Sequence, residues 1–407
     1  MKQTLHALVV DVERRRALAA AYGAKWLLPA LTCDERTRSL PLVSRWLLER
    51  GIRGDVAGQW LGRVSGESMD WLVAIAAAVE DGDATAGLLW QPLDELASRA
   101  SVLEYQNWAL ERTLRRGPLP SVDGPFGSTC WPQAVRRWIG SVVDVSVDSL
   151  TPYRCGAHEV VVGAQCGPAR VFFKGLAQDR TAEVRTTRAL AAIEPESFAR
   201  TIAVARRCDG CTWWLTAECA GRSGGDLQCV AEALARIQQR VLQVGTARLP
   251  LRPVDLDAAE RWASDLLGDS AHRDLVGRAC ARLRGADVPA TWIPIDLDPT
   301  NVLIDEGRPR FIDVDDSFLG PAPLAMATLA MRCTDRGLYP TYRRSWPAAL
   351  AGVDWRTFET VAAVIQAWLG WTRLEQNVGR GDVSVDSGFA SSRTRARLSR
   401  AIDALSS

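Results

Sequence analysis

Apolar and polar residues are arranged in the first part of the chain in a way that predicts both strands and helices. The segments 6–12 (HALVVDV) and 71–79 (WLVAIAAAV) are apolar runs of strand length. Between them, 39–51 (SLPLVSRWLLERG) repeats its apolar positions as an amphipathic helix does, and 103–116 (LEYQNWALERTLRR) has the same periodicity. We therefore predict a small α/β domain over residues 1–116.

A stretch rich in proline, glycine and serine, 115–132 (RRGPLPSVDGPFGSTCWP), follows this domain. Beyond it, 158–165 (HEVVVGAQ) and 169–175 (ARVFFKG) are predicted strands and 182–193 (AEVRTTRALAAI) is a predicted helix. The remainder is mostly helical and is interrupted by a β segment at 292–316. The predicted organisation is an α/β domain at 1–116, a linker at 117–131, a β-rich lobe with a hinge at 132–221 and a helical lobe at 222–407. Two such lobes predict an α+β, bilobal enzyme with a cleft between them.

Composition narrows the class of protein. The chain has 407 residues, 24% of them charged, and a formal net charge of +1, which argues against a disordered chain and against nucleic acid as a partner. No apolar run approaches the roughly 18 residues of a membrane span, and the start is too charged for a signal peptide. We therefore expect a cytoplasmic protein without a membrane partner. Of 49 basic residues, only Lys2, Lys25 and Lys174 are lysines.

The ten cysteines are scattered along the chain, which fits reduced thiols better than a disulfide framework. Cys208 and Cys211 form a C-x-x-C motif, but the intervening Asp209-Gly210 is a hairpin-turn dipeptide between two strand-like segments. We predict a turn here, and a metal or redox site is the alternative.

Two carboxylates and one amide lie near one end of a predicted hairpin. Asp296 and Asn301 precede the strand 302–304, and the strand 310–312 leads into Asp313. Because antiparallel pairing places the start of one strand beside the end of the other, we expect these three side chains to converge. Such oxygen ligands suit Mg²⁺, which binds one or two carboxylates together with substrate phosphates. The alternative is that these residues cap turns.

A second polar pair lies upstream. Lys174 shares one face of its strand with Phe172, and Glu183 shares a helical stripe with Leu190. A carboxylate on an inward face needs a partner, because burying an unpaired charge is costly. Lys174 is the candidate partner, and a purely structural salt bridge is the alternative to a functional pair.

Together these residues resemble the aminoglycoside phosphotransferase and choline-kinase-like family, a branch of the protein-kinase-like fold, over about residues 131–400. The family's catalytic loop, H-G-D-x-x-x-x-N, corresponds to 294–301 (PIDLDPTN), and its I-D metal motif corresponds to 311–315 (FIDVD). Lys174 in VFFK and Glu183 in AEVRTTRAL match the family's strand lysine and helix glutamate.

The resemblance implies a kinase that uses ATP and Mg²⁺ to phosphorylate a hydroxyl group. The roles that it implies are Lys174 at the α- and β-phosphates, Glu183 orienting that lysine, Glu218 and Ala220 of the hinge 213–221 (WWLTAECAG) at the adenine, Asp296 as catalytic base, and Asn301 and Asp313 as ligands of Mg²⁺.

The chain departs from the family pattern at several positions. Pro294-Ile295 replaces the His-Gly before the catalytic aspartate, Asp298 replaces a second histidine, and Gln238 replaces a histidine on an upstream helix. The segment 320–327 (GPAPLAMA) lacks the aspartate of G-D-P-x-x-D-L-A, and only 154–157 (RCGA) is a candidate for a phosphate-covering loop. These departures bear on efficiency and substrate rather than on the type of reaction.

The N-terminal domain resembles a Nudix fold through 25–29 (KWLLP), 46–52 (WLLERGI) and 88–96 (LLWQPLDEL). A working Nudix box needs several acidic residues on its helix to hold metal. Glu49 is present, but Leu48, Arg45 and Arg36 stand where acids belong. We therefore expect a non-catalytic Nudix-like domain that shapes the substrate cleft or recruits a partner.

Acidic residues are frequent around the predicted cleft: Asp298, Asp305, Glu306, Asp315, Asp316 and Glu375. If they face the cleft, they favour a cationic acceptor such as an amino sugar or another amine-bearing natural product, and a solvated surface is the alternative.

Three functions remain open. They are a kinase for a small-molecule hydroxyl, on an antibiotic or a biosynthetic intermediate; a kinase for Ser/Thr of a peptide in natural-product biosynthesis; and a non-catalytic nucleotide-binding regulator.

Overall fold

The protein is described from a computed structural model of the full chain. The described residues after the N-terminal region are 131–403, apart from 156–158, 178–180, 347–348, 380–393, 396–397 and 400. Before them, the structure describes 2–11, 16–22, 25–27, 29–34, 39–50, 52, 54–63, 71–79, 88–92, 96 and 126. The predicted helix at 103–116 and nearly all of the predicted linker lie outside the described residues.

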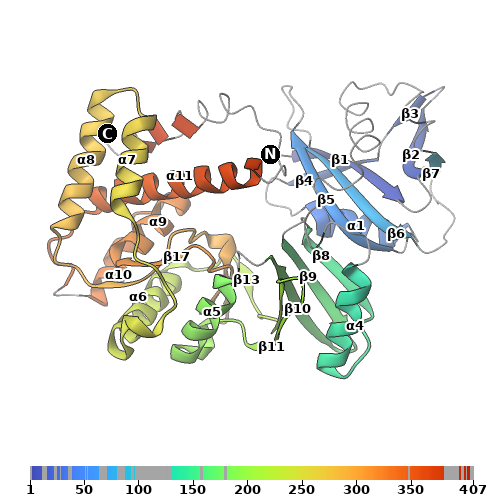
Figure 1. Cartoon of the computed structure of the whole chain (residues 1–407), viewed down its shortest axis with the longest axis horizontal. Helices are drawn as coiled ribbons and strands as arrows, with labels where there is room; N and C mark the ends of the chain where they lie inside the picture. The colour runs from blue at the N-terminus through green and yellow to red at the C-terminus, as the bar shows by residue number, and fades with distance from the viewer. Residues whose placement is uncertain are drawn as a thin grey trace. The chain divides into compact units, whose positions relative to one another are not determined.

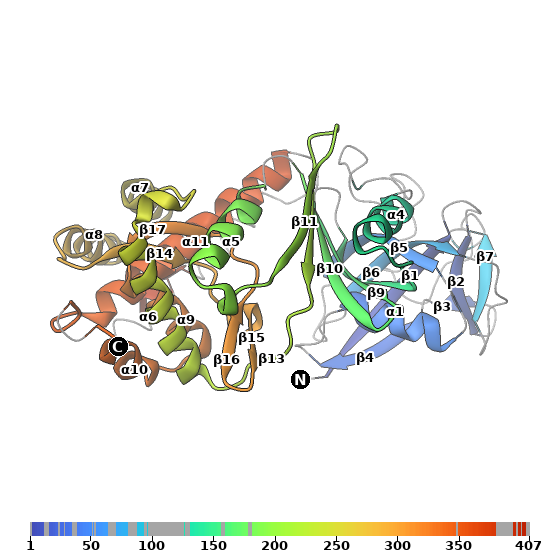
Figure 2. The same cartoon turned by 90° about the horizontal axis from the view of Figure 1, so that it is seen from below.

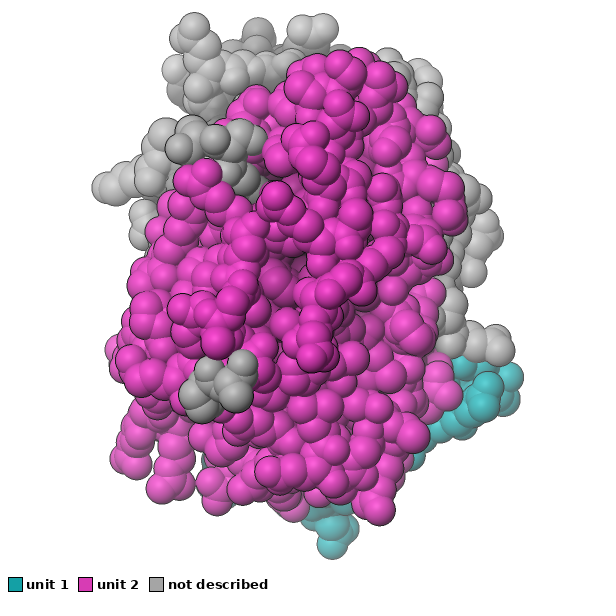
Figure 3. All heavy atoms as spheres, turned by 90° about the vertical axis from the view of Figure 1, so that its left-hand side faces the viewer, with its two compact units in different colours: residues 1–179, 201–217 teal, residues 180–200, 218–407 magenta. Residues whose placement is uncertain are grey.

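The chain forms two compact units, which Figure 3 distinguishes by colour. Unit 1 contains Met1–Asp179 and Thr201–Ala217, and unit 2 contains Arg180–Arg200 and Glu218–Ser407. Among the described helices, none combines the length and the apolar content that a membrane span requires.

The described strands of the N-terminal region form one mixed sheet in unit 1. Its strand order is β3-β2-β1-β6-β5, with β4 paired to β1 and β7 paired to β2. The strands are β1 (Lys2–Asp11), β2 (Arg16–Tyr22), β3 (Lys25–Leu27), β4 (Ala30–Asp34), β5 (Gly54–Arg63), β6 (Trp71–Val79) and β7 (Leu88–Pro92). The central strands β1 and β6 are parallel, and the helix between them in sequence is α1 (Ser39–Glu49). The predicted strands at 6–12 and 71–79 and the predicted helix at 39–51 are thus confirmed.

A second sheet of unit 1 is antiparallel throughout, in the order β11-β12-β10-β9-β8. Its strands are β8 (Ser149–Cys155), β9 (Glu159–Cys166), β10 (Ala169–Leu176), β11 (Thr201–Arg206) and β12 (Thr212–Ala217). The helix α4 (Trp131–Val143) covers one face, where Trp138 packs edge-on against Phe173 and Trp213, at centroid distances of 5.8 and 5.4 Å. Aromatic pairs prefer this T-shaped contact, which fixes α4 on the sheet.

The strand β8 was not predicted, since its end was interpreted as a phosphate-covering loop at 154–157. Arg154 and Cys155 pair with Val161 and Val160 of β9, while the rest of the candidate loop, 156–157, lies outside the described residues, so its role stays a prediction. The helix α1 packs against β8, and its buried Val43 and Leu47 belong to the same hydrophobic core as the second sheet. The helix predicted to carry a degenerate Nudix box therefore has a packing role within unit 1.

The C-x-x-C segment is a tight turn, as predicted. The backbone N–H of Arg207 donates to Cys211 O at 2.8 Å, the Asp209 carboxylate accepts from the N–H of Cys211 at 2.9 Å, and Gly210 has a positive φ of 83°. Burial, reinforced by Asp209, raises the pKa of Cys211 to about 12. A thiol that stays protonated is a poor metal ligand, because metals bind the thiolate.

Unit 2 is mainly helical. Its helices are α5 (Ala182–Ile193), α6 (Leu227–Val244), α7 (Leu256–Leu266), α8 (Ser270–Arg284), α9 (Pro323–Cys333), α10 (Leu338–Arg344) and α11 (Trp355–Gly379). The long helix α11 packs against α7, α8 and α9 (Figure 1). At the N-terminus of α6, Asp226 caps the helix by accepting from the N–H of Gln228, and Gly245 ends it with a φ of 92°.

Short strands interrupt the helices of unit 2, in two small sheets. They are β13 (Arg222–Ser223), β14 (Ala290–Pro294), β15 (Val302–Asp305), β16 (Arg308–Phe311) and β17 (Ser317–Pro321). The hairpin β15–β16 is the predicted one, and β13 adds to its edge (Figure 2). The strand β17, which pairs with β14, was not predicted because its sequence SFLGP contains glycine and proline, and its partner is distant in sequence.

Gly221 lies where the backbone of unit 2 approaches itself closely. It has a φ of 109°, and a Cβ at this position would lie 2.6 Å from the carbonyl carbon and oxygen of Ile304. Gly224 has a φ of 77° but has no atom within 4 Å of a Cβ position. Both positions require glycine for conformation, and only Gly221 requires it for space.

We expect Gly221→Ala to lower the free energy of unfolding more than Gly224→Ala does. Each variant carries the strain of a left-handed backbone, about 1–3 kcal/mol. Gly221→Ala adds an overpacking cost of about 1–3 kcal/mol, because backbone atoms of β15 cannot move aside independently. Urea unfolding of the two variants measures the difference, and equal losses would contradict the close approach.

Candidate active site

The loop that contains Asp296 is held on both sides by buried apolar residues. Ile295 and Leu297 are 1% and 3% exposed and belong to the core of unit 2, so the side chain between them points outward. The N–H of Ile295 donates to Asp316 O at 2.9 Å, and Gln366 of α11 donates to Ile295 O at 3.1 Å. These contacts support the loop where the family has His-Gly, and they fix the position of Asp296.

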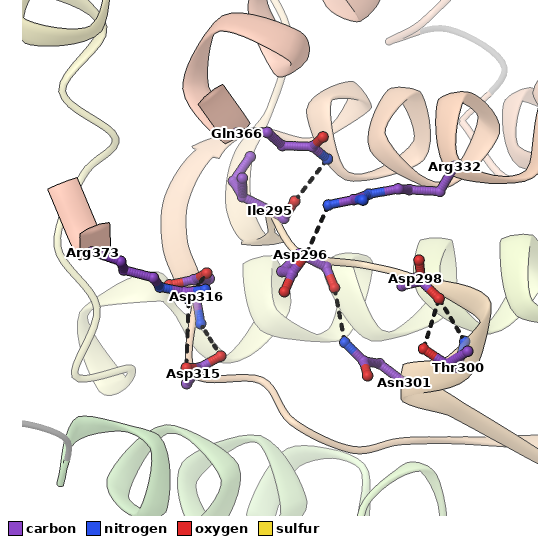
Figure 4. A network of polar contacts seen from close by, with 10 residues as sticks. All are labelled: Ile295, Asp296, Asp298, Thr300, Asn301, Asp315, Asp316, Arg332, Gln366 and Arg373. Carbon is purple, nitrogen blue, oxygen red and sulfur yellow. Dashed lines mark hydrogen bonds and ion pairs between the residues drawn. The ribbon is translucent and has the colours of Figure 1, made fainter. Parts of the chain in front are cut away.

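Asp296 contacts two side chains from different elements (Figure 4). Arg332, near the end of α9, donates from Nη2 to Asp296 Oδ1 at 3.0 Å, and Asn301 donates from Nδ2 to the backbone oxygen of Asp296 at 3.1 Å. The side chain of Asp296 is 38% exposed. The carboxylate is thus ionically paired through one oxygen and is still accessible.

Asn301 and Asp313 flank the same end of the hairpin β15–β16. Val302 pairs with Phe311, and the N–H of Ile312 donates to Asn301 O at 2.9 Å. Asp313 follows directly and is exposed, with a left-handed φ of 59°. A non-glycine residue in this region costs energy and is often found at functional sites. The predicted juxtaposition of Asp296, Asn301 and the hairpin end is therefore confirmed, whereas their chemical roles stay predictions.

The donor set at this hairpin end suits a nucleotide-bound Mg²⁺ rather than a metal held by protein alone. Among the described residues, no group of three or more His, Cys, Asp or Glu could hold a metal ion. Mg²⁺ needs only one or two protein oxygens when phosphates and water supply the rest. The hydrogen bond from Asn301 Nδ2 to Asp296 orients the amide, and within the described part of the chain its Oδ1 accepts no hydrogen bond. Asn301 Oδ1 and the Asp313 carboxylate are the groups that fit.

Two positions that differ from the family have structural roles. Asp298 caps the short 3₁₀ helix Pro299–Asn301 by accepting from the N–H and the hydroxyl of Thr300, at 2.9 and 2.7 Å. Gln238 is fully buried, donates to the backbone oxygens of Trp292 and Ala322, and accepts from Tyr342 at 2.5 Å. Asp298 therefore caps a turn, and Gln238 joins α6 to β14 and α9.

Lys174 lies on the face of β10 opposite the one that packs on α4, as its alternation with Phe173 predicts. It forms an ion pair with Glu159 of β9 at 3.4 Å, and Glu159 also pairs with Arg154 at 3.1 Å. The carboxylate of Glu159 is only 7% exposed, so both cations stabilise a buried charge. Sequence reasoning missed Glu159, although its position diagonally across from Lys174 in the strand pairing is the signal that could have identified it.

Glu183 is 3% exposed on α5 and lies on the same buried stripe as Leu190, as predicted. Lys174 belongs to unit 1 and Glu183 to unit 2, so their pairing stays a prediction. The predicted hinge crosses the boundary between units, because β12 ends at Ala217 in unit 1 and Glu218 begins unit 2. The adenine contacts of Glu218 and Ala220 also stay predictions.

A cavity of about 960 Å³ opens beside Asp296 within unit 2. Its polar lining includes three carboxylates, and each has an arginine partner that also lines it. The pairs are Asp296 with Arg332, Glu359 with Arg336, and Asp316 with Arg373. The rest of the lining is largely apolar and comes mostly from α9 and α11, together with Thr394, Leu398 and Ala401.

Sequence reasoning missed these arginines. The chain contains many arginines, so nothing in the composition distinguishes Arg332 and Arg373 from the others. Of the acidic residues predicted to crowd the cleft, Asp315 and Asp316 are both ion-paired with Arg373 (Figure 4). One guanidinium is thus shared by two carboxylates, which compensates part of their charge within unit 2 and which the one-dimensional pattern of acids did not indicate.

Comparisons with known proteins identify the fold. No protein-family model matches the chain, and no curated protein matches its sequence. Among solved structures, a spectinomycin phosphotransferase in complex with ADP and spectinomycin matches with a TM-score of 0.50 and 12% identity, over 67% of this chain and 98% of that one. The chain has the kinase-like phosphotransferase fold.

Two further structures are similar to this kinase-like chain. One is a choline/ethanolamine kinase family protein from Mesorhizobium loti, with a TM-score of 0.49 and 14% identity over 67% of this chain and 95% of that one. The other is a choline kinase from Streptococcus pneumoniae, with a TM-score of 0.48 and 13% identity over 67% of this chain and 99% of that one. The predicted α+β, kinase-like fold is confirmed, and the Nudix-like character of the N-terminal domain stays a prediction.

Proposed function

We propose that the protein is a phosphotransferase that uses ATP and Mg²⁺ to phosphorylate a hydroxyl group of a small molecule. The observation that carries the proposal is Asp296, an accessible carboxylate beside a cavity, hydrogen-bonded through its backbone to Asn301 in a kinase-like fold. A carboxylate next to an amide and a second carboxylate at a hairpin end is the arrangement that phosphoryl transfer from ATP uses.

In the proposed reaction, the acceptor hydroxyl binds in the cavity and gives its proton to Asp296 as its oxygen bonds to the γ-phosphorus, while the bond from that phosphorus to the departing ADP breaks. Arg332 occupies Oδ1 of Asp296, which leaves Oδ2 for the proton. Asn301 and Asp313 would hold Mg²⁺, which neutralises phosphate charge when bound. Lys174, held by Glu159 on β9, would contact the phosphates of ATP.

The cavity also supports a small molecule over a peptide as the acceptor. Its volume of about 960 Å³ lies at the upper end of the roughly 300–1,000 Å³ that is typical of small-molecule sites. The test is ADP formation by the purified full chain, with ATP and Mg²⁺, against a panel of hydroxyl compounds and Ser/Thr peptides. ADP formation that depends on a small-molecule acceptor would support the proposal. Nucleotide binding without transfer to any acceptor would favour the regulator instead.

Lys174→Arg tests the nucleotide site separately. The guanidinium keeps the positive charge but lacks the compact shape of the ammonium. We therefore expect ATP to bind about 10- to 100-fold more weakly, which corresponds to losing a charge-assisted hydrogen bond. Lys25→Arg is the matched control, because it makes the same chemical change on β3 of the N-terminal sheet. Calorimetric titration with ATP measures both variants, and wild-type affinity in Lys174→Arg would remove Lys174 from the site.

A further inference from the structure

The charged side chains that line the cavity of unit 2 form three ion pairs. Each cavity-lining carboxylate among the described residues contacts an arginine: Asp296 with Arg332 at 3.0 Å, Glu359 with Arg336 at 2.8 Å, and Asp316 in a short contact with Arg373. Asp315 lies outside the lining but also approaches Arg373, at 3.5 Å. Because each of these acids already has a cation beside it, a charged ligand would have to break an existing pair.

The deepest of these pairs is fully satisfied. Glu359 is 2% exposed, and its two oxygens accept from Arg336 Nε and Nη2 at 2.9 and 2.8 Å, and from the Tyr339 hydroxyl at 2.5 Å. Burial and the hydrogen bond to Glu359 raise the pKa of Tyr339, which therefore stays a neutral donor. This carboxylate has no accessible charge to offer to a ligand amine.

The rest of the lining is largely apolar. It includes the small residues Ala330, Ala363, Ala367 and Gly370, beside larger apolar side chains such as Trp371 and Leu398. Small side chains on a helix leave space that a ring-sized apolar ligand can fill, and burying that ligand's surface is favourable at about 25 cal/mol per Å².

From this pairing and this wall, we propose that the acceptor is an uncharged hydroxyl compound with a ring-sized apolar body. The inference rests on the proposed function, and it replaces the expectation of a cationic acceptor. A site built to hold an amine keeps at least one carboxylate available for it, since burying an unpaired charge on either partner is costly. Here an arginine pairs with each lining carboxylate, and Oδ2 of Asp296, the oxygen that stays open, is the one that the acceptor hydroxyl uses.

The test uses three probes with the same ring and different charge: 2-naphthylmethanol, 2-naphthylmethylammonium and 2-naphthoate. Binding to the purified full chain is measured by calorimetric titration in the absence of nucleotide. We expect the alcohol to bind at least about tenfold more tightly than either charged probe, because only the alcohol leaves the ion pairs intact. Tighter or equal binding of a charged probe, or no binding of the alcohol, would overturn the inference.

A gain-of-function variant sharpens the test. Arg373→Met removes the cation beside Asp316, so we expect the ammonium probe to bind at least about tenfold more tightly than to the wild type, while affinity for the alcohol changes little. Arg282→Met is the matched control, since Arg282 forms a comparable ion pair with Asp354 at 3.3 Å and does not line the cavity. No gain for the ammonium probe in a folded Arg373→Met protein would contradict the proposed charge balance.

These measurements are independent of catalysis. If the chain formed no ADP with any acceptor but bound the alcohol probe most tightly, the proposed reaction would be contradicted and the inferred ligand chemistry of the cavity would be supported. If the chain phosphorylated a polycationic acceptor, the proposed reaction would be supported and the inferred class of acceptor would be contradicted.

Discussion

Asp296→Asn should lower the rate of phosphoryl transfer by about 10²- to 10⁴-fold, the range that a general base contributes. An amide cannot accept the proton of the acceptor hydroxyl. Its oxygen can still accept a hydrogen bond from Arg332, and its backbone oxygen still accepts from Asn301, so the loop should keep its geometry. ATP affinity should therefore change little, and the loss should fall on kcat. Steady-state ADP formation and calorimetric titration with ATP separate these two effects.

Asp298→Asn is the matched control for this variant. Asp298 lies two residues away in the same loop, and its Oδ1 accepts from Thr300, which an asparagine oxygen can do equally well. We expect activity within a few fold of the wild type. Full activity in Asp296→Asn, or an equal loss in Asp298→Asn, would show that Asp296 is not the base.

Trp292→Ala should lower the free energy of unfolding by about 3–5 kcal/mol, as truncation of a large buried aromatic does. Trp292 of β14 is fully buried in the core of unit 2, where its ring meets Phe198 and Phe311 edge-on at a centroid distance of 5.8 Å from each. Its indole N–H donates to Ser317 of β17 at 2.9 Å. The cavity left by the indole would separate the hairpin β15–β16 from the β14–β17 pair.

Trp371→Ala is the control for Trp292→Ala, because Trp371 is half-buried at the cavity wall and not enclosed in the core. We expect this variant to lose much less stability. Urea unfolding followed by far-ultraviolet circular dichroism measures both variants. A similar midpoint shift for the two tryptophans would contradict the central packing role of Trp292.

The local sequence pattern predicted many of the helices and strands. The helix α5 was predicted at its observed bounds, 182–193, because its periodic apolar positions are encoded within one segment. The hairpin β15–β16 and the Cys208–Cys211 turn followed from short-range turn chemistry, which likewise needs no distant partner.

The strands that the sequence pattern missed depend on distant partners. The strand β17 exists because β14 supplies its hydrogen bonds, and β8 exists because β9 does the same for it. Neither segment has a strong alternation of its own. Strand formation in such segments is decided by pairing and burial rather than by intrinsic preference.

The candidate site divides in the same way. The resemblance of the sequence to the phosphotransferase family predicted the kinase-like fold, and antiparallel pairing predicted that Asp296 and Asn301 lie beside the end of the hairpin that leads into Asp313. Only the tertiary structure placed Glu159 beside Lys174 and Arg332 beside Asp296. An ion pair between elements depends on how helices and strands pack, and one arginine among many in a sequence does not reveal which carboxylate it will neutralise. The charge of the cavity, and with it the inferred nature of the acceptor, was therefore decided by packing.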